Sequence, residues 1–472
     1  MEEIITQILQ DLGRNLLEAD ISFIKEAERF DKFEETVREL CTATAARILS
    51  EALTDLDDSI RDNADRKRYN IQRRRDRYLV STVGTIKYKH TVFWDKKERG
   101  YRSLLHDMIR LPERERFTTE AEALVLQNAA EESYRKTADK LKIGDQEITK
   151  TTVMNIVHGI PSVIPEANGT EEKKKLEYLY LEADEDHISV QKDPEQQGCF
   201  IGKLIYLYES KEDVYKGRRK LIGKQYFGGL YRGSEENARL WEGVQSYIEE
   251  HYDTDALKKV YIASDGGSWI TGGARYIYKG VLVADKFHVM KYINAAANLT
   301  LDEKDITKGR FYKYIYKNKL TSVKKLLTRI ERHCGGEGII EKTRNYLTNN
   351  WDSIVRAYRD KNVYGCSAEG HVSSVYSDRM SSRPMAWCEP GSDRMCKLRC
   401  YTRNGLNVTD LALYRRDLVL SSGEATGTDD AVALPKYTTE QRRDYRYIEQ
   451  LQVTIPGFTA QKIFSIREHK HL

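Results

Sequence analysis

Residues 176–192, LEYLYLEADEDHISVQK, are the stretch from which the fold of the chain can be predicted. Two runs of strand-forming residues, 178–181 and 188–190, flank the acidic triplet Asp184, Glu185 and Asp186. This pattern favours a hairpin or a bent pair of strands with the carboxylates at the corner. Carboxylates grouped beside a buried strand are costly unless a cation binds there. A solvated turn is the alternative interpretation of this triplet on its own.

A second acidic position has the same setting. The strand-like run 260–264 ends on Asp265, which is followed by Gly266 and Gly267. Open α/β sheets place their chemistry at the carboxyl ends of strands, in the loops that follow. Asp184 and Asp265 on neighbouring strands would form a Mg²⁺ site.

Length and composition limit the class of protein. The 472 residues can hold two or three domains, and 40% hydrophobic with 32% charged residues is typical of a globular protein. We find no apolar run of 18 residues and no signal peptide, which predicts a cytoplasmic location and no membrane contact. The seven cysteines form no CxxC pair, which argues against a disulfide framework. A zinc site at Cys388, Cys396 and Cys400 with His371 is an alternative with unusual spacing.

The N-terminal third suggests DNA binding. Residues 1–77 show helical periodicity and end in a basic patch, and residues 78–112 alternate like a small β-hairpin module. We expect the patch to contact phosphates, with a solvated hinge as the alternative. The patch residues are Arg66, Lys67, Arg68, Arg73, Arg74 and Arg75, followed by Arg77.

Residues 113–165 contain three short helical patterns. The second and third are separated by Ile143-Gly144, and the third is opened by threonines that can cap it. This order resembles a helix-turn-helix, with an ordinary three-helix packing unit as the alternative. The residues expected to face a DNA groove are Lys150, Thr151, Thr152 and Asn155.

The remaining elements follow in a regular order. Strands are predicted at 200–209, 224–231, 259–264 and 280–284, with a helix over 234–252. Residues 291–360 show helical patterns only and predict an all-α insertion. The C-terminal tail, 401–472, contains a segment rich in Gly, Ser, Thr and Asp at 420–436, which predicts a flexible linker.

The motifs in this order resemble a known family. The elements are Glu182-Ala183-Asp184, Ser264-Asp265-Gly266, Asp285-Lys286-Phe287-His288, the run 367–372 (SAEGHV) and the later run 381–385 (SSRPM). Together they are similar to bacterial insertion-sequence transposases of the Lre type, a DDE group related to Mutator-type transposases. The resemblance implies an α/β RNase H-like catalytic domain at 176–290 and 361–400 with the all-α insertion between them. A mostly helical DNA-binding region with a small β-hairpin would precede it.

The resemblance also implies the site. Asp184, Asp265 and Glu369 would be catalytic and would hold two Mg²⁺ or Mn²⁺ ions, with Asp184 shared by both. Two such ions activate a nucleophile and stabilise the leaving oxygen in phosphodiester chemistry. Asp285 and His288 would support the site, although a purely structural His288 is equally compatible. Asp186 and Glu185 are alternatives to Asp184, and Glu389 is the alternative to Glu369.

The function implied is DNA transposition. The protein would bind the terminal inverted repeats of its own insertion sequence, cleave a strand at each end and join the freed 3′-OH to target DNA. Double-stranded DNA is therefore the expected partner, in a bacterial, nucleoid-associated setting. A homo-oligomer is expected because two ends must be held together. The alternatives are a catalytically inactive, transposase-derived DNA-binding protein or another RNase H-like nuclease.

Overall fold

The computed structural model describes residues 2–143, 146–165, 172–191, 198–215, 218–383 and 385–422. The chain divides into two compact units, Met1–Pro165 with Asn407–Leu472, and Glu166–Leu406. The linker predicted at 420–436 lies outside the described residues from residue 423 onward. None of the helices in these ranges combines the length and apolarity needed to cross a membrane.

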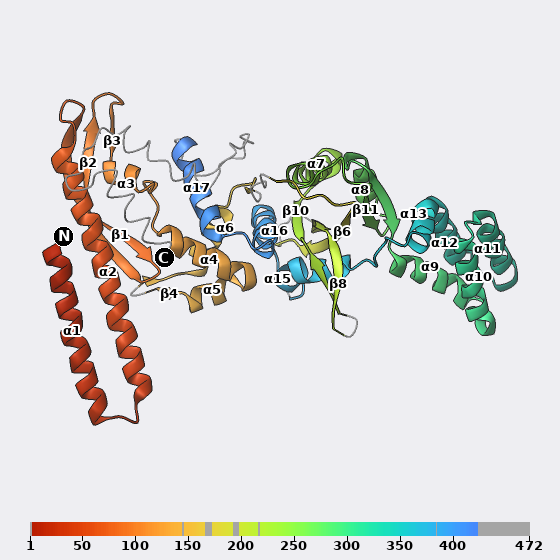
Figure 1. Ribbon diagram of the computed structural model, residues 1–472, viewed down its shortest axis with the longest axis horizontal. Coiled ribbons are helices and arrows are strands. Elements are labelled where there is room, and N and C mark those ends of the chain that lie inside the picture. Colours follow the sequence, from red (N-terminus) through yellow and green to blue (C-terminus); the bar gives the residue numbers. More distant parts are fainter. Residues whose placement is uncertain are drawn as a thin grey trace. The chain divides into compact units, whose positions relative to one another are not determined.

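A helical hairpin opens the first unit. Helices α1 (Glu2–Lys25) and α2 (Phe30–Asn63) pack along each other, and Phe23 stacks on Phe33 beside the turn, with ring centroids 4.8 Å apart. Figure 1 shows the turn end of this hairpin extending beyond the neighbouring strands. The contacts of α1 are therefore made mainly with α2.

The basic segment that follows is a strand rather than the end of a helical region. Strand β1 (Tyr69–Ser81) pairs antiparallel with β2 (Gly84–Asp95), which also pairs with β3 (Gly100–Arg102). The β module thus starts earlier than the predicted boundary at residue 78. Ser50, Thr54 and Asp57 of α2 accept hydrogen bonds from backbone N–H groups of β2. These contacts cover an edge that would otherwise expose unpaired donors.

Three capped helices follow, as predicted, but the connection differs from a tight turn. They are α4 (Thr119–Glu131), α5 (Tyr134–Lys140) and α6 (Lys150–His158), and Thr118, Ser133 and Thr149 each accept a capping hydrogen bond. Between α5 and α6 lies a two-stranded hairpin of β4 (Lys142–Ile143) and β5 (Gln146–Glu147). The predicted break at Ile143-Gly144 is therefore part of a hairpin, and residue 144 lies outside the described residues.

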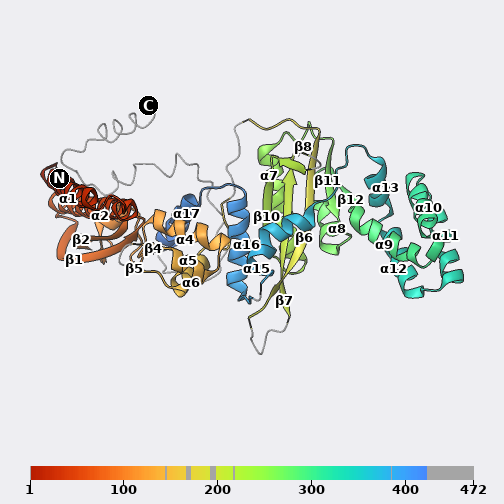
Figure 2. The same cartoon turned by 90° about the horizontal axis from the view of Figure 1, so that it is seen from below.

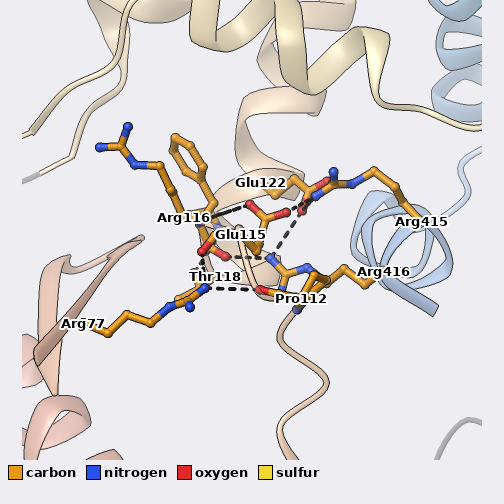
Figure 3. A network of polar contacts seen from close by, with 10 residues as sticks. Arg77, Pro112, Glu115, Arg116, Thr118, Glu122, Arg415 and Arg416 are labelled. Carbon is orange, nitrogen blue, oxygen red and sulfur yellow. Dashed lines mark hydrogen bonds and ion pairs between the residues drawn. The ribbon is translucent and has the colours of Figure 1, made fainter. Parts of the chain in front are cut away.

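A helix that the sequence analysis missed completes this unit. Helix α17 (Val408–Ser422) packs on α4, although residues 401–472 were predicted as a tail. Figure 3 shows why it does so: Arg415 and Arg416 form ion pairs with Glu122, whose side chain is fully buried. Arg415 also pairs with Glu115. A buried carboxylate needs such partners, so α17 belongs to the core of the unit.

The second unit contains a five-stranded mixed sheet in the order β10-β7-β6-β11-β12. Its strands are β6 (Tyr178–Ser189), β7 (Cys199–Tyr208), β10 (Gln225–Leu230), β11 (Lys259–Ser264) and β12 (Gly280–Ala284). Strands β6, β11 and β12 are parallel, whereas β7 is antiparallel to β6 and β10. The bend predicted at the acidic triplet is wrong, because β6 runs straight through it. The sequence analysis also missed a hairpin of β8 (Ser210–Tyr215) and β9 (Arg218–Ile222).

The two faces of this sheet carry different side chains. On one face, Leu179, Leu181 and Ala183 pack with Ile205, Val260 and residues of α7 (Gly233–His251) and α8 (Ser268–Gly273). The other face is contacted by α14 (Ala368–Val372), the π-helical turn η3 (Ser373–Ser377) and α16 (Glu389–Arg403). Because side chains alternate along a strand, Tyr180, Glu182 and Asp184 belong to this second face.

Five helices lie between β12 and α14. They are α9 (Lys286–Asn298), α10 (Lys304–Tyr316), α11 (Leu320–Cys334), α12 (Glu337–Asn349) and α13 (Trp351–Arg359). Figure 2 shows them gathered beyond β12. They share a hydrophobic core of their own that includes Ile293, Phe311 and Ile340. They occupy the range predicted for the all-α insertion.

Candidate active site

Three aspartates lie level with one another: Asp184 within β6, and Asp265 and Asp285 directly after the last residues of β11 and β12. The register pairs Glu182 with Ala263, and Ser264 with Ala284. Continuing it places Asp265 level with both Asp184 and Asp285. Asp184 points to the face that α14 contacts, and the charges of Asp265 and His288 act on its carboxyl, which indicates that they lie nearby. This row is the geometric centre of the candidate site.

Burial and charge act on the first of these carboxyls. Asp184 is half-buried, and burial raises its pKa to about 6, with the charge of Asp265 adding to the shift. The backbone N–H of Glu185 and the positive charge of His288 act in the opposite direction. The ionised form of Asp184 is therefore unfavourable in this setting, and a bound cation would offset that cost.

The third aspartate is held by the start of a helix. Asp285 caps α9 by accepting from the N–H of Phe287 at 2.9 Å, and its other oxygen lies 2.9 Å from Nδ1 of His288. Its own N–H donates to Ser264 at the end of β11. Asp285 and His288 thus form a fixed pair beside the Asp184–Asp265 row.

A buried glutamate lies two residues before Asp184. The Glu182 carboxylate accepts hydrogen bonds from the hydroxyls of Tyr206 and Tyr208, from Lys211 at 2.9 Å and from the N–H of Ser367 at 2.5 Å. Burial favours the protonated form, but Lys211 and the Tyr206 hydroxyl outweigh it and hold the pKa of Glu182 below its ordinary value. Glu182 thereby fastens the segment just before Glu369 to β6.

The helical segment 368–380 is fixed at its other end too. Ser381 donates to Asp186 at 2.7 Å, immediately after α15 (Asp378–Met380). Glu182 and Asp186 flank Asp184 on the same face of β6. The segment therefore lies across the strand that carries Asp184, and its first turn contains Glu369, which is exposed.

The structure places the remaining metal candidates as follows. In the described parts of the chain, no group of three or more His, Cys, Asp and Glu side chains is spaced to hold a metal ion. Glu389 begins α16 and pairs with Arg232 at 3.3 Å. Cys396 and Cys400 are buried, and Cys400 lies 3.5 Å from the Tyr376 hydroxyl. His371 instead lies 2.6 Å from the Tyr226 hydroxyl.

Several cations of the predicted basic patch have partners within the protein. Arg68 pairs with the buried Asp95 at 2.9 Å, and Arg74 pairs with Asp58 at 2.6 Å. Arg77, which directly follows the patch, donates to the backbone oxygens of Pro112 and Glu115, as Figure 3 shows. The exposed members of the patch are Arg66, Lys67, Arg73, Arg74 and Arg75. On α6, Lys150, Thr151 and Asn155 are exposed, whereas Thr152 is half-buried and its N–H donates to the capping Thr149.

Comparison with known proteins gives the family. A model of the uncharacterised protein family UPF0236 matches residues 23–417. A UPF0236 protein of Caldanaerobacter subterraneus subsp. tengcongensis, whose name joins eleven locus designations, is 30% identical over 408 residues, 86% of this chain and 84% of that protein. A second from the same bacterium, with four designations, is 29% identical over equal shares.

Among solved structures, the chain is similar to a chain of the Drosophila P element transposase strand transfer complex. The TM-score is 0.22 and the identity 11%, over 73% of this chain and 90% of that chain. The extent of the family match, from residue 23 to residue 417, means that this chain belongs to the UPF0236 family.

Proposed function

We propose that this protein is a DDE transposase that cleaves DNA at the ends of its own element and joins them to target DNA. The observation that carries the proposal is the row formed by Asp184 in β6 and by Asp265 and Asp285 directly after the neighbouring strands β11 and β12. The helix that contains Glu369 contacts the face of the sheet to which Asp184 points. Carboxylates from separate elements on one sheet edge are what metal-dependent phosphodiester chemistry requires.

The topology supports an RNase H-like catalytic domain. Apart from the β8–β9 hairpin inserted before β10, three antiparallel strands are followed by α7 and by the two parallel strands β11 and β12, which are joined through α8, and β6 lies at the centre of the sheet. The helical insertion separates the last strand from α14. This is the element order that the motif resemblance implies.

The residues of the proposed site fit a hard divalent cation by their chemistry, because Mg²⁺ and Mn²⁺ prefer carboxylate oxygens. Asp184, Asp265 and Glu369 would hold the ions, and Asp184 has a half-buried carboxyl whose charge is unfavourable without one. Bound divalent cations supply activation of the attacking oxygen and stabilisation of the leaving oxygen. Asp285 orients His288, which can donate to a phosphate oxygen.

The relatives support a mobile element. In one bacterium, the name of one relative joins eleven locus designations and the name of another joins four. Repeated copies of one gene are what an element that inserts itself into new sites produces. The exposed cations of the patch and the N-terminal end of α6 are the proposed contacts with double-stranded DNA.

A cleavage assay tests the proposal. The full chain is incubated with Mg²⁺ or Mn²⁺ and duplexes that carry the sequences flanking its gene. We expect strand cleavage that needs the terminal sequence, and a loss of at least about a hundredfold in Asp184→Asn, Asp265→Asn and Glu369→Gln. Glu185→Gln and Glu389→Gln are charge-matched controls that should keep cleavage.

Three outcomes would overturn parts of this proposal. End binding without cleavage by the wild type would indicate a DNA-binding protein without catalysis. Cleavage that ignores the terminal sequence would indicate another nuclease. Full activity in both Asp184→Asn and Asp265→Asn would show that the row is not the catalytic site.

A further inference from the structure

Helix α1 exposes apolar side chains along most of its length. Leu9, Leu17, Ile21 and Ile24 are 52%, 65%, 54% and 68% exposed. Their spacing of roughly one or two turns places them on one side of the helix. Ile8, which is 1% exposed, belongs to the separate row that packs on α2. The helix therefore has two apolar rows, of which α2 covers only one.

The exposed row continues around the turn and is locally open. Phe30, at the start of α2, is 59% exposed. Gly13 lies between Leu9 and Leu17, and a side chain added there would meet nothing within 4 Å. Contiguous exposed apolar surface on a soluble protein usually marks an interaction site.

The charge of the hairpin identifies the kind of occupant. Residues 4–51 contain ten Asp and Glu against six Lys and Arg. A net negative surface repels nucleic acid and anionic lipid headgroups. The occupant that fits is therefore the apolar surface of another protein.

The row is complementary to itself. The row ends at Leu9 and Ile24, which are almost equally distant along the sequence from residue 16. Arg14 lies two residues before residue 16, and Glu18 lies two residues after it. Arg14 is 70% exposed, and its only ion pair among the described residues is with Asp11 at 3.6 Å on the same helix. An antiparallel copy related by a two-fold axis at residue 16 would bring Arg14 of each chain opposite Glu18 of the other. Leu9 would then face the region of Ile24.

We propose that two copies of this chain pair through α1, so that their two hairpins form an antiparallel four-helix bundle. This inference goes beyond the proposed function, because no catalytic or DNA-binding residue takes part in it. If both hold, the bundle is the element that keeps two DNA ends in one assembly.

The mass of the full chain in solution tests the pairing, without DNA or metal. Sedimentation equilibrium should give twice the chain mass of 54.7 kDa at micromolar concentration. Leu17→Glu with Ile21→Glu should give the monomer mass. Asn15→Glu with Ser22→Glu adds the same charge at exposed positions on the side of α1 away from the apolar row and should remain dimeric. Circular dichroism checks that the helices persist in each variant.

A charge exchange tests the antiparallel register independently of folding. Arg14→Glu should weaken the dimer, because two like charges then face each other across the axis, and Arg14→Glu with Glu18→Arg should restore it. A monomeric wild type, a dimeric Leu17→Glu/Ile21→Glu variant, or failure of the exchange to restore the dimer would overturn the proposal. None of these results depends on whether the protein cleaves DNA.

Discussion

Replacing Glu182 by Gln tests whether a buried carboxylate fastens the Glu369-bearing helix to β6. The amide keeps the size of the side chain but has one acceptor oxygen instead of two. Its NH₂ group cannot accept from Lys211, Tyr208 or the N–H of Ser367, all of which donate to the carboxylate. The side chain of Lys211 is only 6% exposed, so its charge would lose its partner in a buried position.

The magnitude follows from that burial. Removing one partner of a buried ion pair costs about 3–5 kcal/mol, because the other charge is left uncompensated. If this loss opens the contact between Ser367 and β6, exchange of the Ser367 amide hydrogen should accelerate on the order of 10²–10⁴-fold. Cleavage should fall as well, because Glu369 begins the helix that the contact positions.

Hydrogen exchange measured by mass spectrometry on peptides covering residues 364–372 reads this effect directly. Glu177→Gln is the matched control, because Glu177 directly precedes the same strand. It pairs with Lys258 at 2.6 Å, and both side chains are more than half exposed. Such an exposed pair contributes about 0–1 kcal/mol. Equal exchange rates in the two variants would refute the role given to Glu182.

Three further predictions concern stability. In the presence of EDTA, Asp184→Asn should unfold at a higher urea concentration than the wild type. The pKa of Asp184 in the folded protein, about 6, lies above the ordinary aspartate value of 3.8, so ionisation opposes folding. Burial lowers the pKa of His106 to about 3, so the unfolded chain takes up a proton at a higher pH than the folded protein, and the first unit should lose stability as pH falls from about 6.5 toward 4. Thermal melting should show a loss of about 2 kcal/mol from this residue by about pH 5. His106→Phe should reduce this pH-dependent loss. Glu122→Gln should cost about 3–5 kcal/mol by leaving Arg415 and Arg416 without their buried partner, whereas the exposed Glu120→Gln should change the urea midpoint little.

The sheet of the second unit was predictable from sequence because its strands are short runs of β-branched and aromatic residues. The continuation of β6 through Asp184 was not, since three consecutive acidic residues normally indicate a turn. In the structure these residues continue the alternation of β6, so Glu182, Asp184 and Asp186 share one face. Their spacing of two residues was the signal that could have identified Glu182 and the straight strand.

Helix α17 was missed for a different reason. It precedes a segment rich in Gly, Ser, Thr and Asp, and was included with that segment in the predicted tail. Its place is fixed by Glu122, nearly 300 residues earlier, through ion pairs that no local pattern indicates. In the same way, no local pattern indicated that two arginines of β1 have partners within the protein, Arg74 with Asp58 and Arg77 with backbone oxygens. Contacts between residues distant in sequence decide such cases.

Isothermal titration calorimetry of the full chain with Mn²⁺ tests, without any DNA substrate, whether Asp184 and Asp265 of the proposed site bind divalent cations. We expect the wild type and Glu185→Gln to bind Mn²⁺, and Asp184→Asn and Asp265→Asn to lose that binding. Unchanged Mn²⁺ binding in both Asp→Asn variants would contradict this expectation.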